Sequence, residues 1–280
     1  MRNSFWDHVS RQSDLKKEMM FLEKIFCESK FYLDCYSCTL INYIDRFYFL
    51  SWAAENKITY PTIGDLRSEI GIERLKKAET LDVANFLLYL ECTVNLINIV
   101  FEKSEDNDAL EIAKNMYFNI STNCERLNFK IVEFSKNLLK IVEKNAATTA
   151  VADKYSGKEP DLSFKVIEYN HFLLRGNIDR KREILCTIAS KFEAVRPLLK
   201  SSGFKELESD AGFLVNNLNI RYNNTDAQSR SHIPHVANMR PDELEKWYDK
   251  TYDVLLLTLL ASDFSAQHKD ILNLRQQFER

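Results

Sequence analysis

The feature that most constrains the fold is the absence of Gly and Pro from two long stretches, residues 1–60 and 72–156. Gly and Pro are the residues that most often separate short strands and form tight turns. The whole chain holds only six Gly and five Pro in 280 residues, while 45% of its residues are hydrophobic. There is enough apolar surface for real cores, and the chain is predicted to be all-α. Turn-rich sandwiches, propellers and glycine-looped nucleotide folds are disfavoured.

Apolar residues in the first half recur at the three- and four-residue steps that stack side chains on one helical face. Helices are expected over the segments that end near residue 31 and that span 36–52, 65–70, 81–102 and 109–143. The segment 36–52 is so rich in Leu, Ile, Tyr and Phe that it is expected to be a buried, central helix. Residues 1–145 are therefore predicted to form an N-terminal helical bundle.

A domain boundary is expected at residues 146–163, which lose the apolar period and gather small and polar residues around Gly157 and Pro160. This segment is predicted to be a linker. Residues 164–280 are predicted to form a second helical bundle, with helices over 164–174, 179–199, 206–220, 241–260 and 266–278. Pro241 lies at a favourable position for a helix start, followed by two acids that suit the helix dipole.

Charge and cysteine content narrow the classes of protein further. The formal net charge of −3 gives no bulk attraction to nucleic acid or to an anionic membrane. The first ten residues lack a signal-peptide core, and the longest apolar run, residues 254–261, is under half a membrane span. A cytoplasmic protein with no membrane contact is expected. Cys35 and Cys38 have the spacing of a zinc or redox pair, but no second pair accompanies them, so reduced helical thiols and no metal are expected.

The sequence lacks a phosphate-binding Gly loop, a zinc-protease motif, a nucleophile elbow and an EF-hand, so the usual signals of many enzyme classes are missing. One local cluster is strongly basic: Arg175, Arg180, Lys181 and Arg182 surround a single acid, Asp179. Such a cluster is suited to a phosphate backbone if it lies beside a groove, and these four residues are the candidate RNA contacts. The alternative is an ordinary solvated helix start.

The most informative stretch is 213–260, in which a helix rich in Leu and Asn ends near Arg221, a polar loop follows, and a strongly apolar helix comes next. The loop contains Arg230, His232 and His235, with four residues between Arg230 and His235. This order resembles HEPN domains, helical bundles found in abortive-infection, toxin and antiviral systems, many of which are metal-independent RNases. In that family an Arg precedes a His by four to six positions at the junction of two helices. The resemblance covers residues 163–280 at most.

The resemblance implies attack of an RNA 2′-hydroxyl on the adjacent phosphate. His235 would be the general base, Arg230 would stabilise the charge of the transition state, and His232 and Arg221 would assist. Asn223 and Asn224 would contact RNA, although helix capping and turn formation are the plainer reading of these residues. No metal or cofactor is implied.

Two functions remain open from the sequence. The first is an RNA endonuclease, a toxin or antiviral defence effector that acts as a homodimer, with the N-terminal bundle sensing, inhibiting or assembling. An inhibitory or sensor protein is then a further expected partner. The alternative is a non-catalytic helical interaction or regulatory protein that keeps only a degenerate HEPN-like fold.

Overall fold

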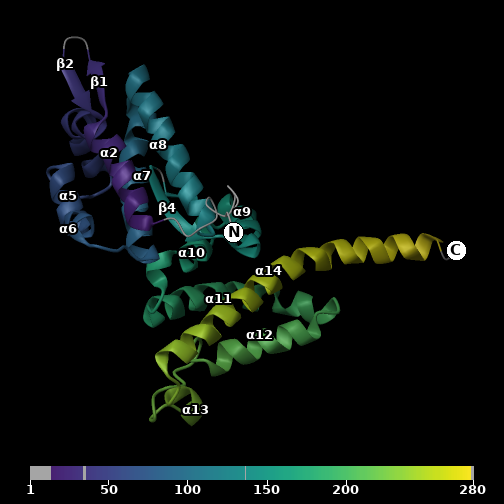
Figure 1. The fold of residues 1–280 in the computed structure, drawn as a ribbon. Coiled ribbons are helices and arrows are strands. Elements are labelled where there is room, and N and C mark those ends of the chain that lie inside the picture. Colours follow the sequence, from purple (N-terminus) through teal and green to yellow (C-terminus); the bar gives the residue numbers. More distant parts are fainter. Residues whose placement is uncertain (1–13, 34–35, 136, 279–280) are drawn as a thin grey trace, which may run out of the picture. The chain divides into compact units, whose positions relative to one another are not determined.

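A computed structural model describes residues 14–33, 36–135 and 137–278, and the chain divides into two compact units, Met1–Ile141 and Val142–Arg280. Most of the described residues are helical, and the strands among them form two small two-stranded sheets (Figure 1). The helical character predicted from the Gly and Pro content is therefore confirmed. The division between the units falls a few residues before the predicted one.

The first unit contains helices and two strand pairs. Its elements are α2 (Leu15–Glu28), β1 (Lys30–Leu33), β2 (Tyr36–Thr39), α3 (Leu40–Ile44), the π-helical turn η1 (Asp45–Phe49), α4 (Leu50–Glu55), α5 (Ile63–Ile70), α6 (Ile72–Lys77), α7 (Val83–Lys103), α8 (Asn107–Arg126), β3 (Phe129–Ser135) and β4 (Leu138–Glu143), which ends just past the division between the units.

Strands occupy two places where apolar periodicity predicted continuous helix. β1 and β2 pair antiparallel from Lys30 opposite Thr39 to Leu33 opposite Tyr36, so the helical part of 36–52 begins only at Leu40. The predicted helix 109–143 ends at Arg126, and β3 and β4 follow it. Asn128 and Asn137 adopt left-handed backbone angles (φ 67° and 68°), a conformation that Asn tolerates better than most residues and that reverses the chain.

The core of the first unit is built around α7, which is apolar on most of its circumference. Its buried residues include Phe86, Leu90, Val94 and Ile97, which lie one or two turns apart. α7 is the one helix among the described residues that is long and apolar enough to cross a membrane, and 56% of its apolar window is buried. A core helix of a soluble protein passes the same test.

The second unit contains α9 (Ala146–Ser156), α10 (Pro160–Tyr169), the short 3-10 helix η2 (Phe172–Leu174), α11 (Ile178–Ser201), α12 (Lys205–Asn217), α13 (Pro234–Ala237) and α14 (Pro241–Phe278). α14 is one continuous helix, so the two segments predicted at 241–260 and 266–278 are parts of a single element. It packs against α11, α12 and α9, and the core residues Tyr248, Leu255 and Leu259 face these neighbours from it (Figure 1).

The segment 146–163 is helical, and the prediction of a linker there is wrong. Asn145 caps α9 by accepting a hydrogen bond from the Thr148 amide at 3.0 Å. Val151, Tyr155 and Leu162 are buried in the core of the second unit. Ser163 of α10 is buried and donates to the carbonyl oxygen of Ala152 on α9 at 2.9 Å, so small residues of this segment lie in the contact between the two helices.

Candidate functional site

The residues predicted to be catalytic lie on the segment between α12 and α14, residues 218–240, here called the 218–240 loop. Asn219 and Asn224 hold its shape. The Asn219 amide donates to Asn224 Oδ1 at 2.7 Å, and the Asn224 amide donates to Asn219 Oδ1 at 3.0 Å. Asn224 Nδ2 also donates to the Ser231 carbonyl at 2.8 Å. Because Asn224 is 1% exposed, the prediction that it contacts RNA is wrong, whereas Asn223 is exposed and pairs with Asp226.

The four predicted catalytic side chains have different surroundings. Arg230 and His235 are exposed, and within the described residues neither side chain makes a hydrogen bond or ion pair. His232 is half-buried, and its Nδ1 is buried without a hydrogen-bond partner. Arg221 forms an ion pair with Glu193 at 2.8 Å, on α11. The cavity that His235 lines is not lined by Arg230, His232 or Arg221.

Acidic residues pair with three of the four side chains of the predicted basic cluster. Arg180 binds Glu168 at 2.7 Å and also Glu183. Lys181 is 5% exposed and lies 2.8 Å from Glu245 and 2.6 Å from Asp249. This pairing leaves little net charge for a phosphate backbone.

The two remaining members of the cluster are also engaged. Arg175 forms an ion pair with Glu143 at 3.3 Å, and Arg182 donates from Nε to the carbonyl oxygen of Asn219, at the start of the 218–240 loop. Arg182 thus supports the backbone of the loop. Lys181 and Arg182 hold structure together, and the prediction that they contact RNA is wrong for the buried Lys181.

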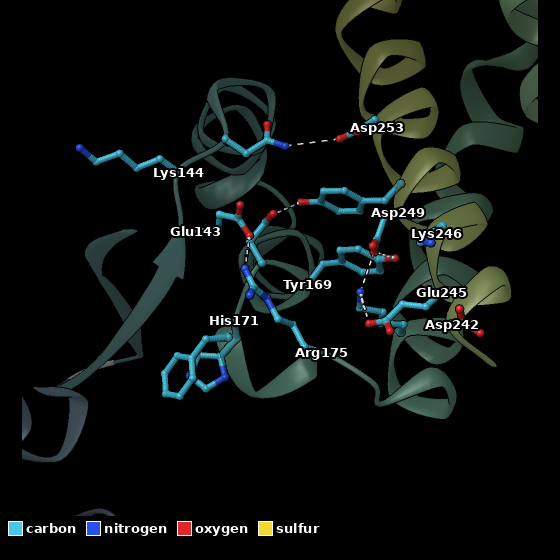
Figure 2. A pocket seen from close by; sticks show the side chains of 15 residues that line it. Glu143, Lys144, Tyr169, His171, Arg175, Asp242, Glu245, Lys246, Asp249 and Asp253 are labelled. Atoms are coloured by element: carbon cyan, nitrogen blue, oxygen red, sulfur yellow. Dashed lines mark hydrogen bonds and ion pairs between the residues drawn. The ribbon is translucent and has the colours of Figure 1, made fainter. Parts of the chain in front are cut away.

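A polar cavity of about 550 Å³ opens between α14 and the segments around α9 and α10 (Figure 2). α14 presents four acids to it at helical spacing, and the other wall carries Glu143, Lys144 and Arg175. The acids of α14 are Asp242, Glu245, Asp249 and Asp253. The cavity therefore has walls of both charge signs.

Two tyrosines line this cavity and tie its walls together. The rings of Tyr169 and Tyr252 stack with centroids 4.0 Å apart and planes 7° apart. Tyr252 Oη donates to the Val166 carbonyl at 2.7 Å and accepts from Asn170 Nδ2 at 2.7 Å. Tyr169 Oη donates to Asp249 at 3.0 Å. These bonds fix α10 against α14.

The ionisation of the cavity groups follows from burial and pairing. Burial raises the pKa of Tyr169 far above its usual value, and the nearby Asp249 raises it further, so this hydroxyl stays protonated. Burial also acts to raise the pKa of Glu245, but hydrogen bonds from Lys181 and the Gly176 amide outweigh it and leave the pKa below its ordinary value. Tyr169 therefore serves as a hydrogen-bond donor to Asp249, and Glu245 as an ionised partner of Lys181.

The surface between α12 and α14 is apolar and hollowed. Two adjoining cavities of about 360 and 500 Å³ share the lining residues Phe213, Leu214 and Trp247. We call them together the α12–α14 groove. The remaining lining residues are Asn217, Leu218, Ile233, His235, Val236 and Met239 at one end and Asp210, Lys250, Asp253 and Val254 at the other. Phe213 is 64% exposed and Trp247 36% exposed, and Lys250 Nζ lies 4.4 Å above the Trp247 ring.

Sequence reasoning selected the 218–240 loop but missed the groove beside it. Phe213 and Trp247 both lie within the stretch 213–260, yet their exposure depends on how α12 and α14 pack. Phe213 was the available signal, since it is a large aromatic residue that lies off the buried face of α12. The buried residues of that helix are Glu208, Ala211, Gly212 and Val215.

Comparison with known proteins finds no match among family models, curated proteins or solved structures. Within residues 14–33, 36–135 and 137–278, no three His, Cys, Asp or Glu side chains are grouped as a metal site would need. The described cysteines are free, and Cys38 lies in β2 rather than on the expected helix. Cys35 lies outside the described residues.

Proposed function

We propose that this protein acts by binding another protein through the α12–α14 groove, as a helical interaction module. The observation that carries the proposal is a hollow apolar surface with two aromatic side chains exposed on it, Phe213 and Trp247. Complete burial of one such side chain contributes about 1.5–3 kcal/mol. Tryptophan is also enriched among the residues that dominate binding energy.

The shape and lining of the groove favour an amphipathic helix as the bound segment. Such a helix places apolar side chains at three- and four-residue steps into a groove between two helices. Asp210 and Lys250 lie at the polar end of the groove and offer charges of both signs to the edges of the bound helix. RNA is a poorer fit, because the cations of the basic cluster are already paired.

Photocrosslinking in cells of the native host tests this function. A photoactivatable phenylalanine analogue at Phe213 is expected to give a discrete protein adduct. The matched control is the same analogue at Phe118, which is 70% exposed on α8, outside the groove, and is expected to give none. Absence of an adduct at 213, an identical adduct at 118, or an adduct that ribonuclease removes would each contradict the proposal.

A second candidate is the metal-independent endoribonuclease implied by the HEPN resemblance. It is favoured by the exposure of both Arg230 and His235, whose side chains have no partner within the described residues. His235 would accept the 2′-hydroxyl proton, and Arg230 would stabilise the charge on the phosphate. His232 and Arg221 would be auxiliary, and two copies would face a shared RNA substrate.

Cleavage of mixed RNA by the purified full chain in EDTA distinguishes this candidate. The endoribonuclease predicts cleavage that is lost in His235→Ala and in Arg230→Ala and retained in Arg240→Ala, a matched control with an exposed arginine paired to Asp242. Absent cleavage, or equal cleavage by all four proteins, would remove this candidate.

A further inference from the structure

The last part of α14, residues 264–278, extends past the helices that pack against the rest of α14 (Figure 1). We call it the C-terminal arm. Phe264, at its base, packs edge-to-face on Phe204 of the body with ring centroids 5.9 Å apart and is 48% exposed. Further along the arm, Ile271, Leu272, Leu274 and Phe278 are 41%, 42%, 52% and 84% exposed. A single helix without tertiary packing is marginally stable in water. The apolar face of the arm is therefore expected to be covered by another protein surface.

The apolar residues of the arm follow a heptad pattern. The positions 264, 267, 271, 274 and 278 alternate steps of three and four residues, and four of the five are occupied by Phe, Ile or Leu. Residues at these steps form the seam of a two-stranded coiled coil. The one polar residue on the seam is Gln267, which is exposed. Leu272 lies off the seam.

The charges beside the seam favour an identical helix in parallel orientation as the partner. Asp263 and Asp270 precede the seam positions 264 and 271, whereas His268 and Arg275 follow the seam positions 267 and 274. In a parallel pair of identical helices, a residue that precedes one seam position lies opposite the residue five positions later on the other chain, which follows the next seam position. Asp270 then faces Arg275 of the second copy. An antiparallel pair would place acid against acid.

Charges on the arm and the body are consistent with that pairing. Within the described residues, neither Asp270 nor Arg275 has an ion-pair partner, so both are available to a second copy. Asp263 pairs with Lys154 of its own chain at 2.7 Å and lies where the arm leaves the body. His268 would face Asp263 of the second copy, which is already engaged by Lys154, so the pair expected to set the orientation is Asp270 with Arg275.

We propose that the C-terminal arm binds the same arm of a second copy as a parallel two-stranded coiled coil. This pairing goes beyond the proposed function, since it uses neither the α12–α14 groove nor the 218–240 loop. It would present two grooves in one particle, which strengthens binding to a partner that carries two matching segments.

The mass of the full-length protein in solution, measured over a range of concentrations, tests the pairing. The native chain is expected to be a dimer, and the double variant Ile271→Lys with Leu274→Lys is expected to be a monomer, with a Kd raised more than about 100-fold. The melting of the body should be unchanged, because Ile271 and Leu274 are exposed and lie outside its core, whereas the helical signal of the separated arms is expected to fall. A monomeric native chain, or a dimer that the double variant leaves intact, would overturn the proposal.

Orientation is tested with charge reversal and with cysteine pairs. Asp270→Arg alone should weaken the dimer, and Asp270→Arg with Arg275→Asp should restore it. Under oxidation, Leu274→Cys on the seam should form a covalent dimer far faster than the off-seam control Leu272→Cys. Failure of the double reversal to restore pairing, or equal disulfide formation at 274 and 272, would contradict a parallel coiled coil.

Discussion

Glu23 and Arg67 form a buried charge pair inside the first unit. Their oxygen and nitrogen lie 2.5 Å apart, and the two side chains are 7% and 3% exposed. Tyr89 Oη donates to the other Glu23 oxygen at 3.2 Å, and Lys76 Nζ lies 3.3 Å from the carboxylate. A buried pair of this kind contributes little net stability compared with apolar packing, but removal of one partner leaves an uncompensated charge.

Arg67→Ala is therefore expected to lower the free energy of unfolding by about 3–5 kcal/mol, because Glu23 would stay buried without its main counter-ion. The matched control is Lys76→Ala, which removes a more exposed cation from the same carboxylate and should cost about 1 kcal/mol or less. Urea denaturation followed by circular dichroism measures both. Equal losses would show that the burial of Arg67 has no energetic weight.

The same pair predicts a pH dependence. Burial acts to raise the pKa of Glu23, but the hydrogen bond and charge of Arg67 outweigh it, so the pKa lies below 4.5. A carboxyl whose pKa is lower in the folded protein adds stability above its unfolded pKa and loses that stability as the pH falls through the folded pKa. The difference in unfolding free energy between the native chain and Glu23→Gln should shrink as the pH falls below 4.5. A difference that stays constant with pH would contradict this.

Asn224 and Asn223 offer a test of the 218–240 loop with neighbouring residues. Asn224→Ala removes hydrogen bonds to the Asn219 amide and the Ser231 carbonyl, and should cost about 2 kcal/mol. Asn223→Ala removes an exposed side chain and should change the unfolding free energy by less than about 0.5 kcal/mol. Thermal denaturation of both variants measures this contrast. A neutral Asn224→Ala would mean that the loop is not held by this side chain.

Contacts between residues that are distant in the sequence could not be predicted. The stretch 213–260 was selected because a polar loop between two apolar helices is visible in the residue pattern, and the structure places a loop there between α12 and α14. The residue pattern gave no indication that Lys181 meets Asp249, which lies 68 residues further along the chain. A local cluster of positive charge is a binding surface only if no distant carboxylate neutralises it, and that depends on tertiary packing.

At the scale of helices and strands, Gly71 and Gly157 both end helices but differ in backbone conformation. Gly71 ends α5 and precedes α6 with a left-handed φ of 88°. Gly71→Ala should therefore cost about 1–2 kcal/mol. Gly157 ends α9 with a φ of −87° and open space around it, so Gly157→Ala should be neutral or stabilising by up to about 1 kcal/mol. Melting temperatures that shift equally would contradict this assignment.

Helices with clear apolar periods and capping residues were predictable, and the strands were not. α7, α11 and the first part of α14 lie close to the predicted ranges. The hairpin of β3 and β4 was read as helix because its apolar residues continue the spacing of α8. The β-branched residues Ile131, Val132, Ile141 and Val142 and the two Asn residues with positive φ, Asn128 and Asn137, were the overlooked signals.

At the scale of the whole molecule, the chain consists of two units with separate cores, and the proposed functions lie on the second. Its α12–α14 groove is the proposed surface for a partner, and its C-terminal arm is the proposed means of pairing two copies. Neither proposed role depends on RNA binding or cleavage by the basic cluster or by the arginines and histidines of the 218–240 loop. The two surfaces are separate on the chain, so variants of one should leave the other intact.

The most direct test of the central claim compares groove crosslinking in the native chain and in Trp247→Glu, with the photoactivatable residue at position 213 in both. Since 1.4 kcal/mol corresponds to a tenfold change in affinity, a charged side chain in the groove should lower the yield of the protein adduct at least about tenfold. An adduct whose yield is the same in Trp247→Glu would contradict binding through the α12–α14 groove.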